Sequence, residues 1–190
     1  MVCIKTGWDR GLSWEECKRI LDQALAKALN FSPSVSDVNA LGYLAVLYTQ
    51  LYNGCRVREA LVAVGGWLED GNNVREVRVQ KRKDNKYRTV IVPKIIPRDA
   101  INTLALKVQN VKVYANRLGL NTHTLRYAFI TKCLKEGHNP AVVAKITGHK
   151  RLDQLLTYVQ AREAEEILKN FVPGAGGSPS SDGDRIEVKK

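Results

Sequence analysis

Apolar residues recur at intervals of three and four positions over most of the chain, in segments separated by glycine, proline and asparagine. The first segment covers 14–29 and follows an S-x-x-E capping box formed by Ser13 and Glu16. The second follows a weaker box at 34–37, is apolar on most faces, and ends at Asn53-Gly54. Such a pattern is typical of a buried helix that closes with a left-handed glycine cap.

The centre of the chain changes to a strand-like pattern. After a short helix expected over 56–62, three valines between 74 and 79 stand among charged residues. The polar run 81–86 follows, and the apolar segment 87–92 ends at a proline. Two apolar segments joined by a polar turn indicate an antiparallel hairpin, with a register defined to within a residue or two.

The remaining segments return to helical spacing. Helices are expected after Pro97 and over 111–118, 124–134, 140–147, 152–159 and 161–171. The order of helices, a small hairpin and further helices predicts an α+β fold, mainly α, in which a helical domain carries a small antiparallel β-sheet.

The charge balance points to a polyanionic partner. The 190 residues include 30 Lys and Arg against 19 Asp and Glu, a formal net charge of +11. The final segment, 173–190, is rich in glycine, serine and proline and its charges cancel, so it is expected to be disordered. The whole excess therefore lies on 1–172, the predicted folded domain, and favours nucleic acid as the partner.

The sequence also argues against several classes of protein. No apolar run approaches the ~20 residues that a membrane span needs, and the first ten residues lack the pattern of a secretory signal. The cysteines are scattered without a CxxC pair, which argues against a zinc ribbon or a disulfide framework. We therefore expect a soluble protein of a reducing compartment, with no metal, no cofactor and no membrane partner.

Basic residues follow the predicted end of the second helix. Arg56 comes two residues after Gly54, so the turn fixes its position, and its planar guanidinium suits two phosphate oxygens at once. Glu59 lies one helical turn further on and could hold that guanidinium. A surface ion pair at a helix start is an equally good interpretation of these two residues taken alone.

The predicted hairpin turn carries Lys81, Lys83 and Lys86. A lysine on such a turn can enter a DNA groove and give a proton to a leaving oxygen. Taken alone, a solvated run of charges is the commoner explanation.

Two further places hold acid–base residues. His123 and Arg126 lie three positions apart at a predicted helix start, where anions are favoured. His149 follows Gly148, and Tyr158 lies nine residues later. A phenol has a free pKa of about 10 and becomes a nucleophile only where cations stabilise its anion. Each residue alone is commonly structural.

Taken in order, these positions read Arg, Lys, His-x-x-Arg, His, Tyr. With this set the sequence resembles the catalytic domain of the tyrosine recombinase (phage integrase) family. The resemblance covers roughly 10–172, and the matching stretches are NGCRVREAL (53–61), KDNKYRTVIVP (83–93), THTLRYAFITKCL (122–134) and ITGHKRLDQLLTY (146–158).

The resemblance implies how a scissile phosphate is held. Arg56 and Arg126 would clamp its non-bridging oxygens and neutralise charge that grows in the transition state. His149 would hydrogen-bond the same phosphate, and Glu59 would support the site.

The resemblance also implies how the bonds change, without metal or ATP. Tyr158 would attack the phosphorus, form a 3′-phosphotyrosyl bond and free a 5′-hydroxyl, and His123 would help to take the phenol proton. Lys83 would give a proton to the leaving oxygen. Among the three turn lysines it matches best by its distance to the following strand, but Lys81 and Lys86 remain alternatives.

By the same resemblance, the partner is double-stranded DNA, bound by a chain that is monomeric when free and forms a synaptic tetramer on DNA, in a prokaryotic or viral-host cytoplasm. DNA contacts are expected from Arg58, Lys81, Arg82, Lys86, Arg88, Lys150 and Arg151. Family members usually carry a separate N-terminal core-binding domain. We expect it to be absent from this chain, with weak binding and poor recombination as the result.

Two other functions fit part of this pattern. A type IB topoisomerase shares the domain and the tyrosine chemistry but relaxes DNA without exchanging strands between duplexes. A DNA-binding module that kept the fold without activity is the other alternative, and the complete residue set argues against it.

Overall fold

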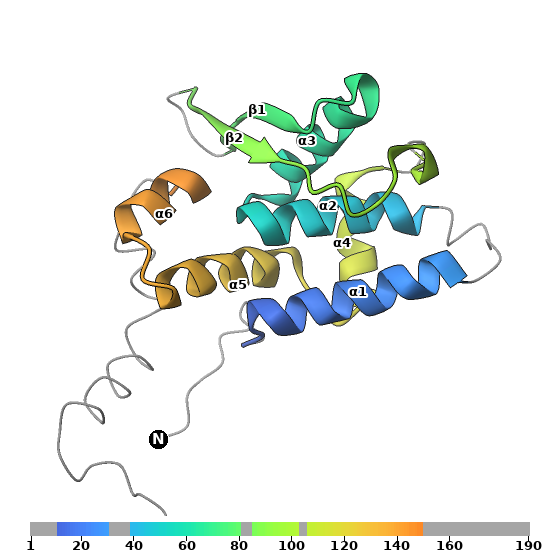
Figure 1. The fold of residues 1–190 in the computed structure, drawn as a ribbon, viewed down its shortest axis with the longest axis horizontal. Coiled ribbons are helices and arrows are strands. Elements are labelled where there is room, and N and C mark those ends of the chain that lie inside the picture. Colours follow the sequence, from blue (N-terminus) through green and yellow to red (C-terminus); the bar gives the residue numbers. More distant parts are fainter. Residues whose placement is uncertain (1–10, 31–38, 81–84, 103–105, 150–190) are drawn as a thin grey trace, which may run out of the picture.

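In the computed structural model, which describes residues 11–30, 39–80, 85–102 and 106–149, a buried helix lies at the centre (Figure 1). This helix, α2 (Ala40–Asn53), is buried without interruption over 44–51. Helices α1 (Trp14–Asn30) and α5 (Thr122–Lys135) pack on one side of it, and α3 (Val57–Asp70) with the sheet lies on the other (Figure 1). The apolar pattern of α2 thus positions every neighbouring element.

The predicted ends of the first two helices are confirmed. At the start of α1, Ser13 N donates to Glu16 Oε2 (2.7 Å) and Glu16 N donates to Ser13 Oγ (3.1 Å), a complete capping box. Helix α2 ends at Gly54, which adopts a left-handed φ of 56°. The expected box at 34–37 lies outside the described residues.

Helix α3 is longer than the expected 56–62. It continues through Gly65-Gly66 to Asp70 because Val64 and Trp67 are buried against the core, and this packing outweighs the low helix propensity of glycine. The guanidinium of Arg75 lies over Gly66, and a side chain at 66 would have to displace it.

The predicted hairpin is confirmed as a two-stranded antiparallel sheet of β1 (Val74–Arg78) and β2 (Tyr87–Ile91). Its register pairs Val77 with Arg88, so that Arg88 lies on the inward face together with Val90.

A single 3₁₀ turn, η1 (Arg98–Ala100), follows Pro97 in place of the expected helix. Helix α4 (Val108–Arg117) begins three residues before its predicted start, and α5 and α6 (Pro140–Thr147) lie where helices were expected. The α+β, mainly α prediction is therefore confirmed. The helices expected over 152–159 and 161–171, and the tail 173–190, lie outside the described residues.

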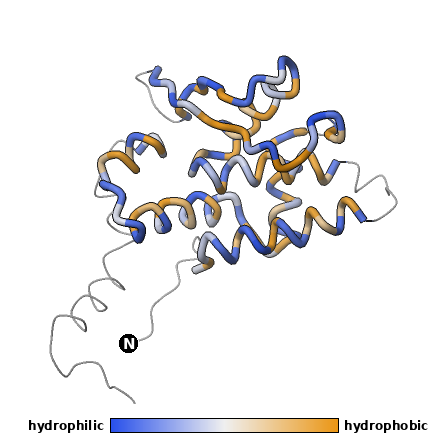
Figure 2. Tube along the Cα trace, viewed as in Figure 1, coloured by the Kyte–Doolittle hydropathy of each residue, from blue (hydrophilic) through white to orange (hydrophobic). Residues whose placement is uncertain are grey.

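Hydrophobic and hydrophilic stretches alternate along α1, as expected of a helix that packs one face on the core (Figure 2). Polar contacts fix its position: Trp14 Nε1 donates to the Leu51 carbonyl (3.1 Å), and Tyr48 Oη donates to Asp22 Oδ1 (2.7 Å). None of the helices that the structure describes is long and apolar enough to cross a bilayer.

Candidate active site

The turn between α2 and α3 fixes the position of Arg56. A Cβ at Gly54 would lie 2.4 Å from the ring of Phe129, so the close approach of α5 requires glycine there. Gln50 Nε2 donates to the carbonyls of Cys55 and Thr122, both at 3.2 Å, and so links the turn to the start of α5. Arg56 then begins α3 from an extended backbone conformation.

The carboxylate of Glu59 is fully buried and joins three segments. It accepts hydrogen bonds from the backbone N–H of Arg56 (3.0 Å) and from Arg56 Nη1 (3.2 Å). It also accepts from the backbone N–H of Gln80 (2.9 Å), the last described residue before the hairpin turn. One carboxylate thus holds both Arg56 and the backbone that leads into 81–84.

Arg88 lies in the interior, which differs from the surface position expected for a DNA contact. It is 6% exposed, its Nη1 lies 3.5 Å from Glu59 Oε2, and its Nη2 donates to the Asn53 carbonyl (2.7 Å). Burial lowers the pKa of its guanidinium. In the structure Arg88 therefore connects the sheet to Glu59 and to the end of α2.

The side-chain amide of Asn53 attaches the outer edge of β2 to the end of α2. Asn53 Oδ1 accepts from the backbone N–H of Ile91 (2.9 Å), and Asn53 Nδ2 donates to the Ile91 carbonyl (2.8 Å). The amide therefore satisfies both backbone groups of an edge residue, as a neighbouring strand would.

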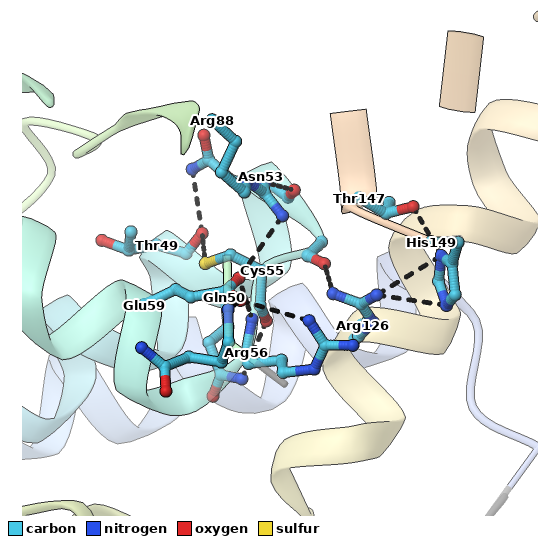
Figure 3. Close-up of polar contacts among 12 residues, drawn as sticks. Thr49, Gln50, Asn53, Cys55, Arg56, Glu59, Arg88, Arg126, Thr147 and His149 are labelled. Atoms are coloured by element: carbon cyan, nitrogen blue, oxygen red, sulfur yellow. Dashed lines mark hydrogen bonds and ion pairs between the residues drawn. The ribbon is translucent and has the colours of Figure 1, made fainter. Parts of the chain in front are cut away.

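Arg126 and His149 lie beside Arg56, as Figure 3 shows. Together with Glu59 and Arg88 these residues form a cluster of charged and polar side chains. Arg126 Nη1 donates to the Gly54 carbonyl (2.8 Å), and its Nη2 lies 3.1 Å from His149 Nε2. Burial, with the positive charge of Arg56 next in importance, lowers the pKa of Arg126 to about 10. At neutral pH this guanidinium is therefore still charged.

His149 is brought into the cluster by the end of α6. Gly148 has a φ of 72°, and the backbone N–H of His149 donates to the Ala144 carbonyl (2.9 Å). Burial and then the charges of Arg126, Arg56 and Arg88 lower the pKa of the imidazole to about 4. The ring is therefore neutral at pH 7.

The structure thus brings together Arg56, Glu59, Arg126 and His149, four of the predicted site residues. His123 is exposed in the first turn of α5, one turn before Arg126, with its ring centroid 6.4 Å from that of Tyr127. Arg58 and Lys86 are exposed. The other predicted residues lie outside the described ranges: Lys81, Arg82, Lys83, Lys150, Arg151 and Tyr158.

Sequence reasoning missed the contacts that hold these residues in place. Gln50 gave no signal, since it lies within an apolar helix. Asn53 was interpreted only as a helix end, and Thr147 was not singled out. For Arg88 a signal exists. Side chains at alternate positions of a strand lie on the same face, and Arg88 shares its face with two valines, Val90 and Val92, which indicates the buried face.

Chemically, the cluster is suited to an anion. The three guanidinium groups of Arg56, Arg88 and Arg126 are balanced by the one carboxylate of Glu59, which leaves an excess of positive charge in a partly buried place. Burial raises the pKa of the adjacent Cys55 thiol to about 12, so this thiol is not an ionised nucleophile. In the part of the chain that the structure describes, no group of His, Cys, Asp and Glu could hold a metal ion.

Known proteins resemble the chain in sequence and in fold. No protein-family model matches the sequence. The chain is 37% identical over 178 residues to ORF241 of Acidianus two-tailed virus, named as a candidate integrase, with 88% of this chain and 70% of that protein covered. A shorter match, 36% identical over 69 residues, is to tyrosine recombinase XerD of Shewanella oneidensis and covers 33% of this chain and 23% of XerD.

A solved structure shares the fold. It is the XerH site-specific recombinase bound to a palindromic difH substrate, with a TM-score of 0.52 and 19% identity. The match covers 83% of this chain and 52% of the XerH chain, so this chain spans about half the length of that protein.

Proposed function

Because this chain belongs to the tyrosine recombinase (integrase) family, we propose that it breaks and rejoins DNA strands through a covalent 3′-phosphotyrosyl intermediate. The observation that carries the proposal is the convergence of Arg56, Arg126 and His149 from three separate segments. Burial, and after it the neighbouring arginine charges, lowers the pKa of both Arg126 and His149, so the site is partly withdrawn from water and positively charged.

A scissile phosphate would bind at the guanidinium groups of Arg56 and Arg126. Both are fixed before DNA arrives, Arg56 by Glu59 and Arg126 by the Gly54 carbonyl. Preorganised donors of this kind cost no rearrangement when negative charge develops in the transition state. The role of these residues is therefore to stabilise the pentacoordinate phosphorus.

Tyr158 would supply the nucleophile. Its phenolic oxygen forms a bond to phosphorus while the bond from phosphorus to the 5′-oxygen breaks. His123, exposed at the start of α5, would accept the phenol proton. A hairpin lysine, Lys83 or its neighbours Lys81 and Lys86, would give a proton to the departing 5′-oxygen. The number of protons is therefore unchanged over the step.

Rejoining would reverse the same step. A 5′-hydroxyl from a second duplex attacks the phosphotyrosyl bond and releases the phenol, so strand exchange needs no external energy source. We propose double-stranded DNA as the substrate and a synaptic tetramer as the assembly that brings two duplexes together. The XerH recombinase that shares this fold was solved with a palindromic difH substrate, in a post-cleavage complex.

A suicide-substrate experiment tests the proposal. A library of random-sequence duplexes, each nicked near its centre, is incubated with the chain, and covalent protein–DNA adduct is separated on a denaturing gel. The short fragment beyond the nick diffuses away, so the adduct accumulates. We expect adduct with the wild type and none with Tyr158→Phe.

Tyr43→Phe is the matched control, because it makes the same change at a tyrosine of the α2–α4 contact, whose ring packs against Tyr114 (ring centroids 5.4 Å apart). This variant should form adduct at the wild-type rate. Adduct formation by Tyr158→Phe would refute the nucleophile assignment. The same assay with a 5′-phosphorothiolate substrate, whose leaving group needs no proton, identifies the general acid. Among Lys81→Ala, Lys83→Ala and Lys86→Ala, we expect this substrate to restore cleavage only in the variant that lacks the general acid.

A further inference from the structure

Thr147, the last residue of α6, is fully buried and touches the imidazole of His149. Its Oγ1 lies 2.7 Å from His149 Nδ1. Figure 3 shows the threonine hydroxyl and the Arg126 guanidinium meeting the ring from different sides. Nδ1 therefore has the threonine hydroxyl as a neighbour that Nε2 lacks, and this neighbour decides which nitrogen carries the proton.

The hydroxyl of Thr147 is already committed as a donor. It donates to the Val143 carbonyl at 2.7 Å, one helical turn back. A hydroxyl has one proton and two lone pairs, so towards His149 it can only accept. The hydrogen bond at Nδ1 therefore runs from the ring to the threonine, and Nδ1 carries the proton.

The guanidinium of Arg126 is compatible with this assignment. Its Nη2 lies 3.1 Å from Nε2 and 3.3 Å from Nδ1, so it approaches both ring nitrogens. A guanidinium has donors and no acceptor, and with the Nδ1 proton given to the threonine only Nε2 has a lone pair to offer it. From the threonine contact we infer that Thr147 is a positioning residue, which holds His149 as the neutral Nδ1–H tautomer and leaves the lone pair on Nε2.

Close packing surrounds the backbone between the two residues. A Cβ at Gly148 would lie 2.8 Å from Val79 Cγ1, so the residue that follows β1 packs directly on Gly148, between Thr147 and His149. Among the residues that the structure describes, the positive groups that act on the ring are Arg126 on α5, Arg56 at the start of α3 and Arg88 on β2. Together with burial they lower the pKa of His149, in keeping with a neutral ring.

The inference rests on the proposed function for its catalytic meaning. A phosphate oxygen is an acceptor, so His149 can bond to it only through an N–H at Nε2. Because Thr147 keeps the proton on Nδ1, Nε2 must take a proton from solvent when phosphate enters. The negative charge of the phosphate favours this uptake, since it offsets the neighbouring arginines.

Nuclear magnetic resonance of the ¹⁵N-labelled chain tests the tautomer directly, without DNA. Long-range ¹⁵N–¹H correlation at neutral pH separates protonated from unprotonated ring nitrogens, and the His149→Gln spectrum identifies the signals of residue 149 among the three histidines. We expect a protonated Nδ1 and an unprotonated Nε2 in the wild type. Thr147→Val, which keeps the shape but lacks the acceptor, should move the ring towards the Nε2–H form, and Thr147→Ser should not.

An Nε2–H tautomer in the wild type, or an unchanged Nδ1–H tautomer in Thr147→Val, would overturn the inference. The wild-type and Thr147→Ser spectra decide the matter even if the valine variant does not fold. In the adduct assay we expect Thr147→Val to react about 10-fold more slowly, as for other residues that orient a histidine. A chain that forms no adduct in any variant refutes the proposed function, while the tautomer result stands by itself.

Discussion

Burial lowers the pKa of two basic side chains, His149 and Arg126, but the two differ in the charge that they carry at pH 7. Removal from water disfavours the charged form of each. The imidazole, with a pKa lowered to about 4, loses its charge at pH 7, whereas the guanidinium, with a pKa lowered to about 10, keeps it. The positive charge of the cluster therefore comes from arginine alone, and His149 can take up a proton when an anion arrives.

The lowered pKa of His149 predicts acid sensitivity of the free protein. Because the folded value, about 4, lies below the value of about 6.5 for an unfolded histidine, the neutral ring contributes stability above pH 6.5. That contribution is lost as the pH falls towards 4. We expect wild type to lose roughly 1 kcal/mol more than His149→Gln over this range, since partial exposure screens much of the linkage.

Thermal unfolding of both proteins between pH 7 and pH 4 measures this difference. His138→Gln is the comparison variant, because it replaces a histidine that lies outside the cluster and has a side chain that is 61% exposed. Parallel profiles of wild type and His149→Gln would contradict the prediction.

The individual residues of the cluster could be predicted because each follows or begins a marked local structure. Arg56 comes after a helix-ending glycine, His149 after another, and Arg126 one turn into a capped helix. The burial of Arg88 was not predicted, because a charged residue in a strand is normally assigned to the solvent face. Its position depends on the register with β1, which pairs it with the buried Val77.

At the level of elements, Glu59 joins α3 to Arg88 on β2 and to the backbone of Gln80, two residues after β1, through a single buried carboxylate. Breaking a buried ion pair leaves an uncompensated charge, which commonly costs 3–5 kcal/mol. We therefore expect Glu59→Gln to lower the free energy of unfolding by about 3 kcal/mol, mainly through Arg88, whose side chain is 4% exposed.

Urea unfolding measures this loss. Glu69→Gln, on the exposed face of the same helix, should change stability by less than about 0.5 kcal/mol. The double variant Glu59→Gln with Arg88→Met removes both buried charges and should recover part of the loss. A single variant as stable as the wild type would show that the carboxylate does not hold these elements together.

The elements that sequence patterns located best have both a start signal and a stop signal. Helix α6 is bounded by Asn139-Pro140 and Gly148, and its predicted limits are confirmed. Helix α3 was predicted too short, because Gly65-Gly66 suggests a break and only the burial of Trp67 shows that the helix continues. Such burial depends on contacts between distant segments, which local patterns do not contain.

For the molecule as a whole, the net charge of +11 predicts DNA affinity with a steep dependence on salt. If about 6–10 phosphates are neutralised, affinity should fall ~10³–10⁵-fold between roughly 50 and 200 mM salt. Fluorescence anisotropy with a labelled duplex measures this slope.

Two variants locate the contacts. Lys86→Ala removes a predicted contact next to the hairpin turn and should lower the magnitude of the slope by about 1. Lys27→Ala should leave the slope unchanged, since this exposed residue lies on α1, on the other side of α2 from the sheet (Figure 1). Equal effects of the two variants would show that binding does not depend on the hairpin side.

The bond from Arg126 to the Gly54 carbonyl affects how this chain tolerates mutational drift. The acceptor belongs to the main chain, so no substitution at 54 can delete it, and the ring of Phe129 already excludes larger residues there. A substitution at 54 that keeps the backbone of the turn therefore also keeps the acceptor that holds Arg126.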